Sequence, residues 1–274
     1  MDRGKTKNFI IVVLLAVNLF LLLLILLDRA ETWKISGSAR NDIVEVLHLA
    51  GIEAAPEIDF EPDAPAVYTR RRVVEAELEI VHAALGSAEA EDRGGSIIVY
   101  QGARGRATFH GTGDFAIEFE HGPEINLSTP KDALDYLNSL GMMGYYDAKR
   151  QGENPESEII LTSFFDSQPI YNSVTKLSCA GGQLILAEGT RLLDEFFENL
   201  NIKVLTMPTV VMRFLDAVRD SGSLCGELLE IELGMKIELS SSGGGSLVPV
   251  WRFITDTGDF YINGTSGRSE LFSS

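Results

Sequence analysis

The sequence predicts an α+β protein in which one N-terminal transmembrane helix is followed by an exported domain of tandem helix-plus-antiparallel-meander units. Three observations lead to this prediction: an apolar run over 9–27, helical periodicity that recurs along the rest of the chain, and short alternating strands with glycine turns after each helix. We expect a cytoplasmic tail at 1–8, the transmembrane helix at 9–27, a first helix/sheet unit at 30–122, and a C-terminal region at 123–274 that holds two helix-led meander units.

The membrane helix is predicted from the run between Phe9 and Leu27, which is apolar throughout except for Asn18. As a helix this run is about 28 Å long, close to the ~30 Å hydrocarbon core of a bilayer. A cleaved signal peptide and a buried core helix are the alternatives. A signal peptide has a shorter apolar region and a small-residue cleavage site, and the residues after Leu27 contain no such site.

The charges beside this helix predict its orientation. Arg3, Lys5 and Lys7 precede it, and positive residues stay on the cytoplasmic side. The N-terminus is therefore expected in the cytoplasm, and residues 30–274 outside the cell membrane. The chain has 23 basic and 40 acidic residues and a net charge of −17. Such a domain should repel nucleic acid and attract cations or a basic partner surface.

The first exported unit begins with a short stalk at 30–36. Its apolar spacing and glycine turns predict helices at 39–50 and 70–85, loops at 53–66 and Gly86–Gly95, and strands at Ser96–Tyr100, Arg106–His110 and Phe115–Glu120. The last strand alternates apolar and polar residues, which is typical of a half-buried strand in an antiparallel sheet.

The same order of elements then occurs twice more. One helix starts near Pro130 and another near Pro208, each with a hydroxyl residue two positions before the proline (Ser128 and Thr206), as expected for an N-cap. The expected strands after them are 158–165, 169–178 and 183–188, and then 227–239, 247–255 and 259–263, with a flexible loop at Ser240–Ser246. Trp251 and Phe253 share a strand face that should pack under a helix.

Three patterns could indicate catalysis or ligand binding. Asp256-Thr257-Gly258 matches the aspartic-protease motif, but it occurs once, and a hairpin turn is the favoured interpretation. Ser173-Val174-Thr175-Lys176 matches an acylation motif, but it lies within a predicted strand instead of opening a helix. The histidines lack metal-ligand spacing; they are His48, His82, His110 and His121. We therefore expect no cofactor, no metal site and no enzyme activity.

Two cysteines lie in the expected exported part. Cys179 and Cys225 are compatible with a disulfide in an oxidising exterior, and the alternative, slightly favoured, is two small buried hydrophobic residues. Asn18 is a polar residue within the expected membrane helix, where such residues often hydrogen-bond a partner helix. Alternatively, Asn18 faces lipid without a partner.

Both ends of the chain resemble a known family. Met1-Asp2, Lys5-Thr6-Lys7 and the segment Asn18-Leu19-Phe20-Leu21 are similar to the start of YycI, a bitopic accessory protein of Gram-positive bacteria. Leu247-Val248-Pro249-Val250-Trp251-Arg252 and Tyr261-Ile262-Asn263-Gly264-Thr265-Ser266-Gly267 resemble the C-terminal part of the same family. Related YycH proteins share parts of this pattern, and PepSY-type domains have a similar Pro-x-Trp-Arg ending.

The resemblance implies a non-enzymatic regulator of a cell-wall-sensing two-component system. Its implied partners are the sensor histidine kinase of the WalK/YycG type, a YycH-like protein and the membrane. Phe9, Asn18 and Leu27 would contact partner helices in the membrane, and Trp251, Arg252 and Tyr261 are candidate structural or contact residues. The alternatives are a PepSY-like extracytoplasmic module that inhibits a secreted or membrane peptidase, and a protease that uses Asp256.

Overall fold

The computed structural model describes residues 40–60, 66–125, 130–142, 145–146, 157–190, 195–239 and 245–272. The expected membrane contacts Phe9, Asn18 and Leu27 lie outside these residues, as do the tail at 1–8 and the stalk at 30–36. Among the helices within the described ranges, none is long and apolar enough to cross a membrane.

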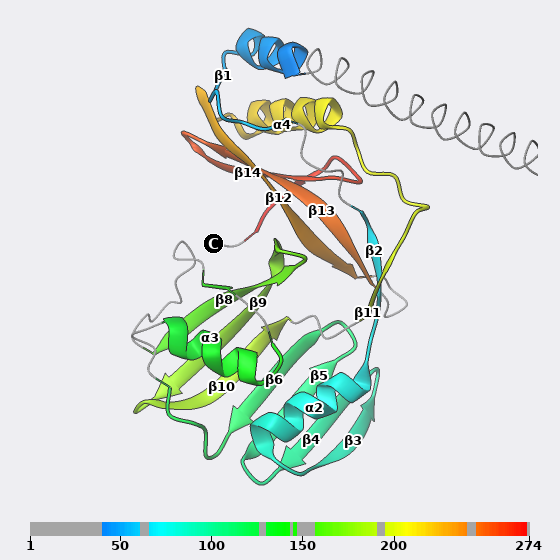
Figure 1. The fold of residues 1–274 in the computed structure, drawn as a ribbon, viewed down its shortest axis with the longest axis vertical. Helices are drawn as coiled ribbons and strands as arrows, with labels where there is room; N and C mark the ends of the chain where they lie inside the picture. The colour runs from blue at the N-terminus through cyan, green and yellow to red at the C-terminus, as the bar shows by residue number, and fades with distance from the viewer. Residues whose placement is uncertain are drawn as a thin grey trace, which may run out of the picture.

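The α+β class is confirmed, because helices cover one face of each of two connected, mainly antiparallel sheets (Figure 1). The first, which we call the N-sheet, has the order β7–β8–β9–β10–β6–β5–β4–β3 and is antiparallel throughout. Its strands are β3 (Ala88–Gly94), β4 (Ile97–Gly102), β5 (Gly105–His110), β6 (Asp114–Phe119), β7 (Tyr145–Tyr146), β8 (Glu158–Phe165), β9 (Gln168–Ala180) and β10 (Gln183–Thr190).

Two helices pack on one face of the N-sheet. They are α2 (Val74–Leu85) and α3 (Pro130–Ser139), and their apolar residues share one core with the sheet. Val81 and Leu85 of α2 are fully buried there, beside Ala133 and Leu137 of α3. The spacing of four residues within each pair places both side chains on one helix face, which explains why each helix covers the sheet.

The second sheet, the C-sheet, carries the C-terminal strands and two earlier ones. Its order is β11–β2–β13–β12, with β14 and β15 continuing from part of β13 and β1 parallel to β12. The strands are β1 (Glu53–Ala54), β2 (Tyr68–Arg71), β11 (Glu195–Glu198), β12 (Glu227–Leu239), β13 (Gly245–Thr255), β14 (Gly258–Asn263) and β15 (Ser269–Glu270). Helical residues 40–49 and α4 (Met207–Ser221) share its second core.

The two sheets meet at a third, smaller core. A parallel bridge joins Met235 of β12 to Ile170 of β9, and both side chains are buried with Ile237 and Leu247. The Phe165 ring packs on this core and lies 4.8 Å from the Tyr68 ring. The connection between the sheets is therefore a packed joint and not a bare linker.

Most predicted strands occur at the predicted positions, and Thr206 takes the predicted N-cap position of α4, although its side chain makes no capping hydrogen bond. The other predicted N-cap, Ser128, lies outside the described residues. Thr206 has extended backbone angles at the N-cap of α4, and Pro208 lies in the first turn. The Thr206 carbonyl accepts a hydrogen bond from the Val210 N–H, while its hydroxyl lies 3.0 Å from the Thr209 hydroxyl. The proline fits because its missing N–H has no helical acceptor in the first turn.

Three predictions from local pattern were wrong. The expected loop at 53–66 begins with a short strand, since Glu53–Ala54 forms β1 and pairs with the distant β12. The segment Gly86–Gly95 is not a loop but contains β3, which pairs with β4 from Ala88 to Gly94. Every β3 residue after Ala88 is exposed, and the strand contains only alanine, glycine and charged residues. It therefore lacks the large apolar or β-branched residues by which a strand is recognised. The helix expected at 70–85 begins at Val74, because Tyr68–Arg71 forms β2 between β11 and β13.

Candidate functional site

The residues singled out by the C-terminal motif lie on both faces of the C-sheet. Trp251 faces the second core and is 3% exposed, beside Phe253. The Phe253 ring stacks on the Phe214 ring of α4 with centroids 4.3 Å apart. Arg252 and its cross-strand neighbour Tyr261 lie on the opposite face, because successive side chains of a strand alternate. We call this opposite face the polar face of the C-sheet.

Arg252 organises one end of the polar face. Its Nε donates a hydrogen bond to Asp259 Oδ2 at 2.9 Å, and its Nη1 donates to Glu232 Oε2 at 2.9 Å. The guanidinium carbon lies 5.8 Å from the centre of the Tyr261 ring. Burial alone would lower the pKa of Arg252, but the hydrogen bond to Asp259 and the neighbouring charges outweigh burial and raise it. Arg252 is therefore a permanent cation held by three strands.

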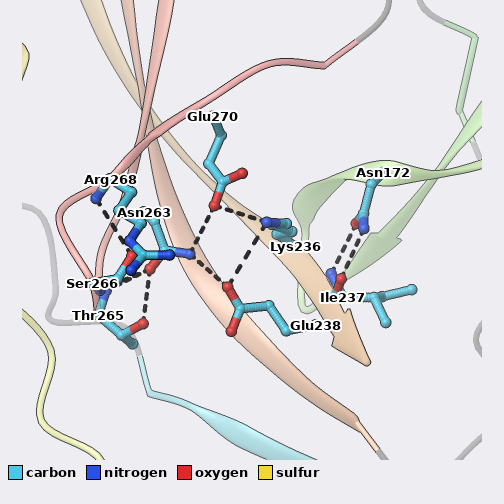
Figure 2. A network of polar contacts seen from close by, with 9 residues as sticks. All are labelled: Asn172, Lys236, Ile237, Glu238, Asn263, Thr265, Ser266, Arg268 and Glu270. Carbon is cyan, nitrogen blue, oxygen red and sulfur yellow. Dashed lines mark hydrogen bonds and ion pairs between the residues drawn. The ribbon is translucent and has the colours of Figure 1, made fainter. Parts of the chain in front are cut away.

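Asn263 organises the other end, as Figure 2 shows. This residue is fully buried, and its Oδ1 accepts hydrogen bonds from the Thr265 N–H, the Thr265 hydroxyl and the Ser266 N–H. Its Nδ2 donates to Glu238 Oε1 at 2.7 Å and to Glu270 Oε1 at 3.2 Å. One amide thereby fixes the turn after β14 and joins β12 to β15.

Lys236 neutralises part of the negative charge of the two carboxylates that Asn263 bonds. Its Nζ lies 2.7 Å from Glu270 Oε1 and 3.8 Å from Glu238 Oε1. Glu270 comes from the C-terminal strand β15, so this ion pair fastens the end of the described chain to β12 (Figure 2). Both carboxylates already share one ammonium and one amide, which makes this a satisfied structural network and not a pair poised for proton transfer.

An aromatic cluster lies where the polar face meets the N-sheet. The Tyr171 ring of β9 is 5.0 Å from Tyr261 and 5.5 Å from Phe272. Beside it, the Asn172 side chain donates to the Ile237 carbonyl and accepts from the Ile237 N–H, both at 2.8 Å (Figure 2). The Asn172 amide thus takes the place of a neighbouring strand, so the two sheets are held by hydrogen bonds as well as by the third core.

The residues of the candidate catalytic motifs have structural roles. Both carboxylate oxygens of Asp256 accept the Gly226 N–H, at 3.1 and 3.2 Å, and the motif forms the turn between β13 and β14. Ser173 is buried in β9 and donates its hydroxyl to the Thr190 carbonyl. Within the described ranges, no group of three or more histidine, cysteine, aspartate or glutamate side chains could hold a metal ion.

Cys179 and Cys225 are free and partly exposed thiols in this structure. Burial raises the pKa of both thiols.

Sequence reasoning missed the partners of the polar face on β12 and β9. In β12 charged residues occupy alternate positions, at Glu230, Glu232, Lys236 and Glu238, and apolar residues occupy the positions between them. That period of two could have revealed a sheet with one charged and one apolar face. No comparable signal exists for Asn172, because it is 65 residues from Ile237.

The comparisons with known proteins give only a weak, fold-level link. No protein-family model matches the chain, and no curated protein matches it. One similar solved structure is the Bacillus megaterium YpeB C-terminal domain, with a TM-score of 0.40, 10% identity, and coverage of 74% of this chain and 97% of that chain. Another is an uncharacterized protein from Eubacterium rectale ATCC 33656, with a TM-score of 0.36, 8% identity, and coverage of 76% and 86%. At such low scores neither similarity assigns a family or a function.

Proposed function

We propose that this chain is an extracytoplasmic, non-enzymatic binding module of the PepSY-like kind, which inhibits a secreted or membrane peptidase. The observation that carries the proposal is the polar face of the C-sheet, where Arg252 and Asn263 hold charged side chains from β12, β14 and β15 in fixed positions. A surface that is already ordered loses little conformational entropy on binding, which favours recognition of a partner.

The connection between the sheets supports the same proposal. Asn172, the third core and the Tyr171 aromatic cluster hold the polar face in a fixed position relative to β9. The roles of Asp256 and Ser173 in the fold also favour a binding role over the protease alternative.

A second candidate is the membrane-anchored regulator that inhibits a cell-wall-sensing histidine kinase. The similarity of the N-terminal segment around Asn18 to YycI, combined with the Trp251-Arg252 segment, favours it. In this case the Phe9–Leu27 helix would dock beside the helices of the kinase or of a YycH-like protein. Both candidates share an anchored, exported binding domain, and they differ in the protein that is bound.

One experiment can separate the two candidates. The full-length chain is reconstituted in nanodiscs and titrated against a membrane preparation from its own source, while hydrolysis by envelope peptidases and autophosphorylation of the sensor kinase are measured in parallel. Falling peptidase activity with unchanged phosphorylation supports the first candidate, and the reverse supports the second. Unchanged rates in both assays, together with no photo-crosslink from the polar face to either protein, would refute both.

A matched variant pair links the result to the polar face. Arg252→Met removes the cation that holds Asp259 and Glu232. Arg93→Met removes a cation from β3, at the far edge of the N-sheet. The proposal expects inhibition to weaken in the first variant and to remain in the second, with both variants shown to be folded by circular dichroism.

A further inference from the structure

The outer edge of β12 has a gap in its pairing. β13 pairs with β12 from Leu228 to Leu239 on one side. On the other side β1 pairs only as far as Leu228. The next contacts come from β9, which packs on Gly234 through Pro169 and Tyr171 and continues with the bridge to Met235 and the Asn172 bonds to Ile237. Among the described residues, nothing pairs with the outer edge of β12 between these points. At 3.2–3.4 Å per residue, the unpaired stretch 229–233 is roughly 17 Å long.

The sequence explains why the gap exists. The Ala55 N–H still donates to the Leu228 carbonyl, but the next residue is Pro56, which has no N–H to donate. The chain turns away there, and the Ile58 N–H donates back to the Ala55 carbonyl. β1 therefore stops at the start of the gap, and β9 contacts β12 only beyond the other end of the gap.

The backbone groups in the gap face outward. Ile237 directs its N–H and carbonyl toward Asn172, on the outer edge. Residues two apart on a strand point their backbone groups the same way, so Leu233 and Ile231 direct theirs toward this edge too. Within the part of the chain that the structure describes, no hydrogen bond to these outward groups is found. Each offers one donor and one acceptor, the pattern that an added strand needs.

The side chains beside the gap determine what strand would fit. On the polar face stand Glu230 and Glu232, and on the helix-covered face stand Ile231 and Leu233, which pack partly on the second core. Glu232 is paired with Arg252, whereas Glu230 has no ion-pair partner among the described residues. An added strand would therefore present basic side chains to one face and apolar side chains to the other.

From these observations we infer that residues 229–233 of β12 bind an extended segment of a partner protein by strand addition, and that this segment alternates basic and apolar residues. The inference deepens the proposed function by naming the chemistry of the partner. Main-chain hydrogen bonds to Ile231 and Leu233 would supply affinity, and the alternating side chains specificity. A second copy of this chain is disfavoured because each copy carries a net charge of −17.

The test uses the full-length chain in nanodiscs and a capped peptide of alternating lysine and valine, with an alternating glutamate and valine peptide as its control. Binding is measured by titration calorimetry and by hydrogen exchange. We expect only the basic peptide to bind and to protect the 229–233 amides. A basic peptide that protects other segments, or an acidic peptide that binds equally well, would overturn the inference.

Two pairs of variants locate the site. Glu230→Lys should weaken binding of the basic peptide by about threefold or more, and Glu91→Lys on β3, with the same change in net charge, should not. Leu233→Pro removes an outward N–H and places a proline ring at the edge, so it should weaken peptide binding by roughly tenfold. Leu233→Ala keeps the N–H, so this variant should bind the peptide more tightly than the proline variant. Equal effects within both pairs would overturn the inference.

The outcomes also separate this inference from the proposed function. If the full-length chain inhibits its target and the Leu233→Pro variant inhibits it equally well, the edge is not the binding site and the proposed function remains. If the basic peptide binds at the edge but neither candidate target responds, the edge site remains and the proposed function fails. Self-association through this edge in sedimentation experiments would overturn the assignment of a basic partner.

Discussion

Gly234 is the position at which the joint between the two sheets is most sensitive to one added methyl group. A Cβ at this position would lie 2.4 Å from Tyr171 Cε2, 2.6 Å from Tyr171 Cζ and 2.8 Å from the Pro169 carbonyl oxygen. Carbon atoms in contact are normally about 3.5–4.0 Å apart, so the ring would have to retreat by about 1 Å. Tyr261 and Phe272 pack on the same ring and restrict that movement.

We therefore expect Gly234→Ala to cost about 1–3 kcal/mol of folding free energy, the usual range for overpacking. For a chain of this size the melting temperature should fall by roughly 2–4 °C per kcal/mol. Thermal unfolding of the full-length chain in nanodiscs measures this fall. Hydrogen exchange should also quicken in 168–172 and 234–237, because the strain lies between β9 and β12.

The matched control is Gly226→Ala, whose nearest neighbour to the added methyl group is Asp256 Oδ2 at 3.3 Å. It should change the melting temperature much less than Gly234→Ala. Combining Gly234→Ala with Tyr171→Ala should destabilise the chain by less than the sum of the single variants, because the clash with the ring is removed. Identical melting temperatures and exchange rates for the two glycine variants would refute a tightly packed joint.

Three further predictions concern the core, the polar network and the thiols. Trp251→Ala should lower stability by about 3–5 kcal/mol in urea unfolding, because the side chain is buried under α4, and an unchanged midpoint would place it at the surface. Asn263→Ala should lower the free energy of unfolding by at least about 2 kcal/mol in the same assay, because buried donors and the carboxylates of Glu238 and Glu270 lose the amide that they bond. An unchanged free energy would show that water replaces the amide. Cys179 and Cys225 should react with iodoacetamide more slowly in the folded chain than in urea at pH 8, since a raised thiol pKa leaves less thiolate, and equal rates would contradict this.

The sequence was most informative where local pattern and tertiary structure agree. The hairpin of β13 and β14 follows from an apolar strand, an Asp-Thr-Gly turn and a second strand, all close together in the chain. β2 could not be found this way, because its partner β11 is more than a hundred residues away, with Arg71 opposite Glu195. β3 was missed because it contains only alanine, glycine and charged residues, none of them a strong strand former.

On the polar face, too, local sequence pattern identified some residues, and contacts between distant segments determined the others. Arg252 and Tyr261 were candidate residues because of a motif, and they are neighbours because β13 and β14 form a hairpin. Their surroundings depend on contacts across the chain, such as Glu232 on β12 and Tyr171 on β9. Sequence spacing alone could not bring these residues together, because the pairing of distant strands determines which side chains meet.

The Trp-Arg pair of the C-terminal motif therefore carries two kinds of information. Trp251 fills the core under α4, a requirement of the fold that chains with different partners can share. Arg252 orders the polar face, but it does so through carboxylates already inside the chain. Partner choice should then depend less on this motif than on exposed positions such as Glu230, which stands beside the open edge of β12. A homologue that keeps the motif and reverses the charge at this position should keep the fold and bind a segment of opposite charge.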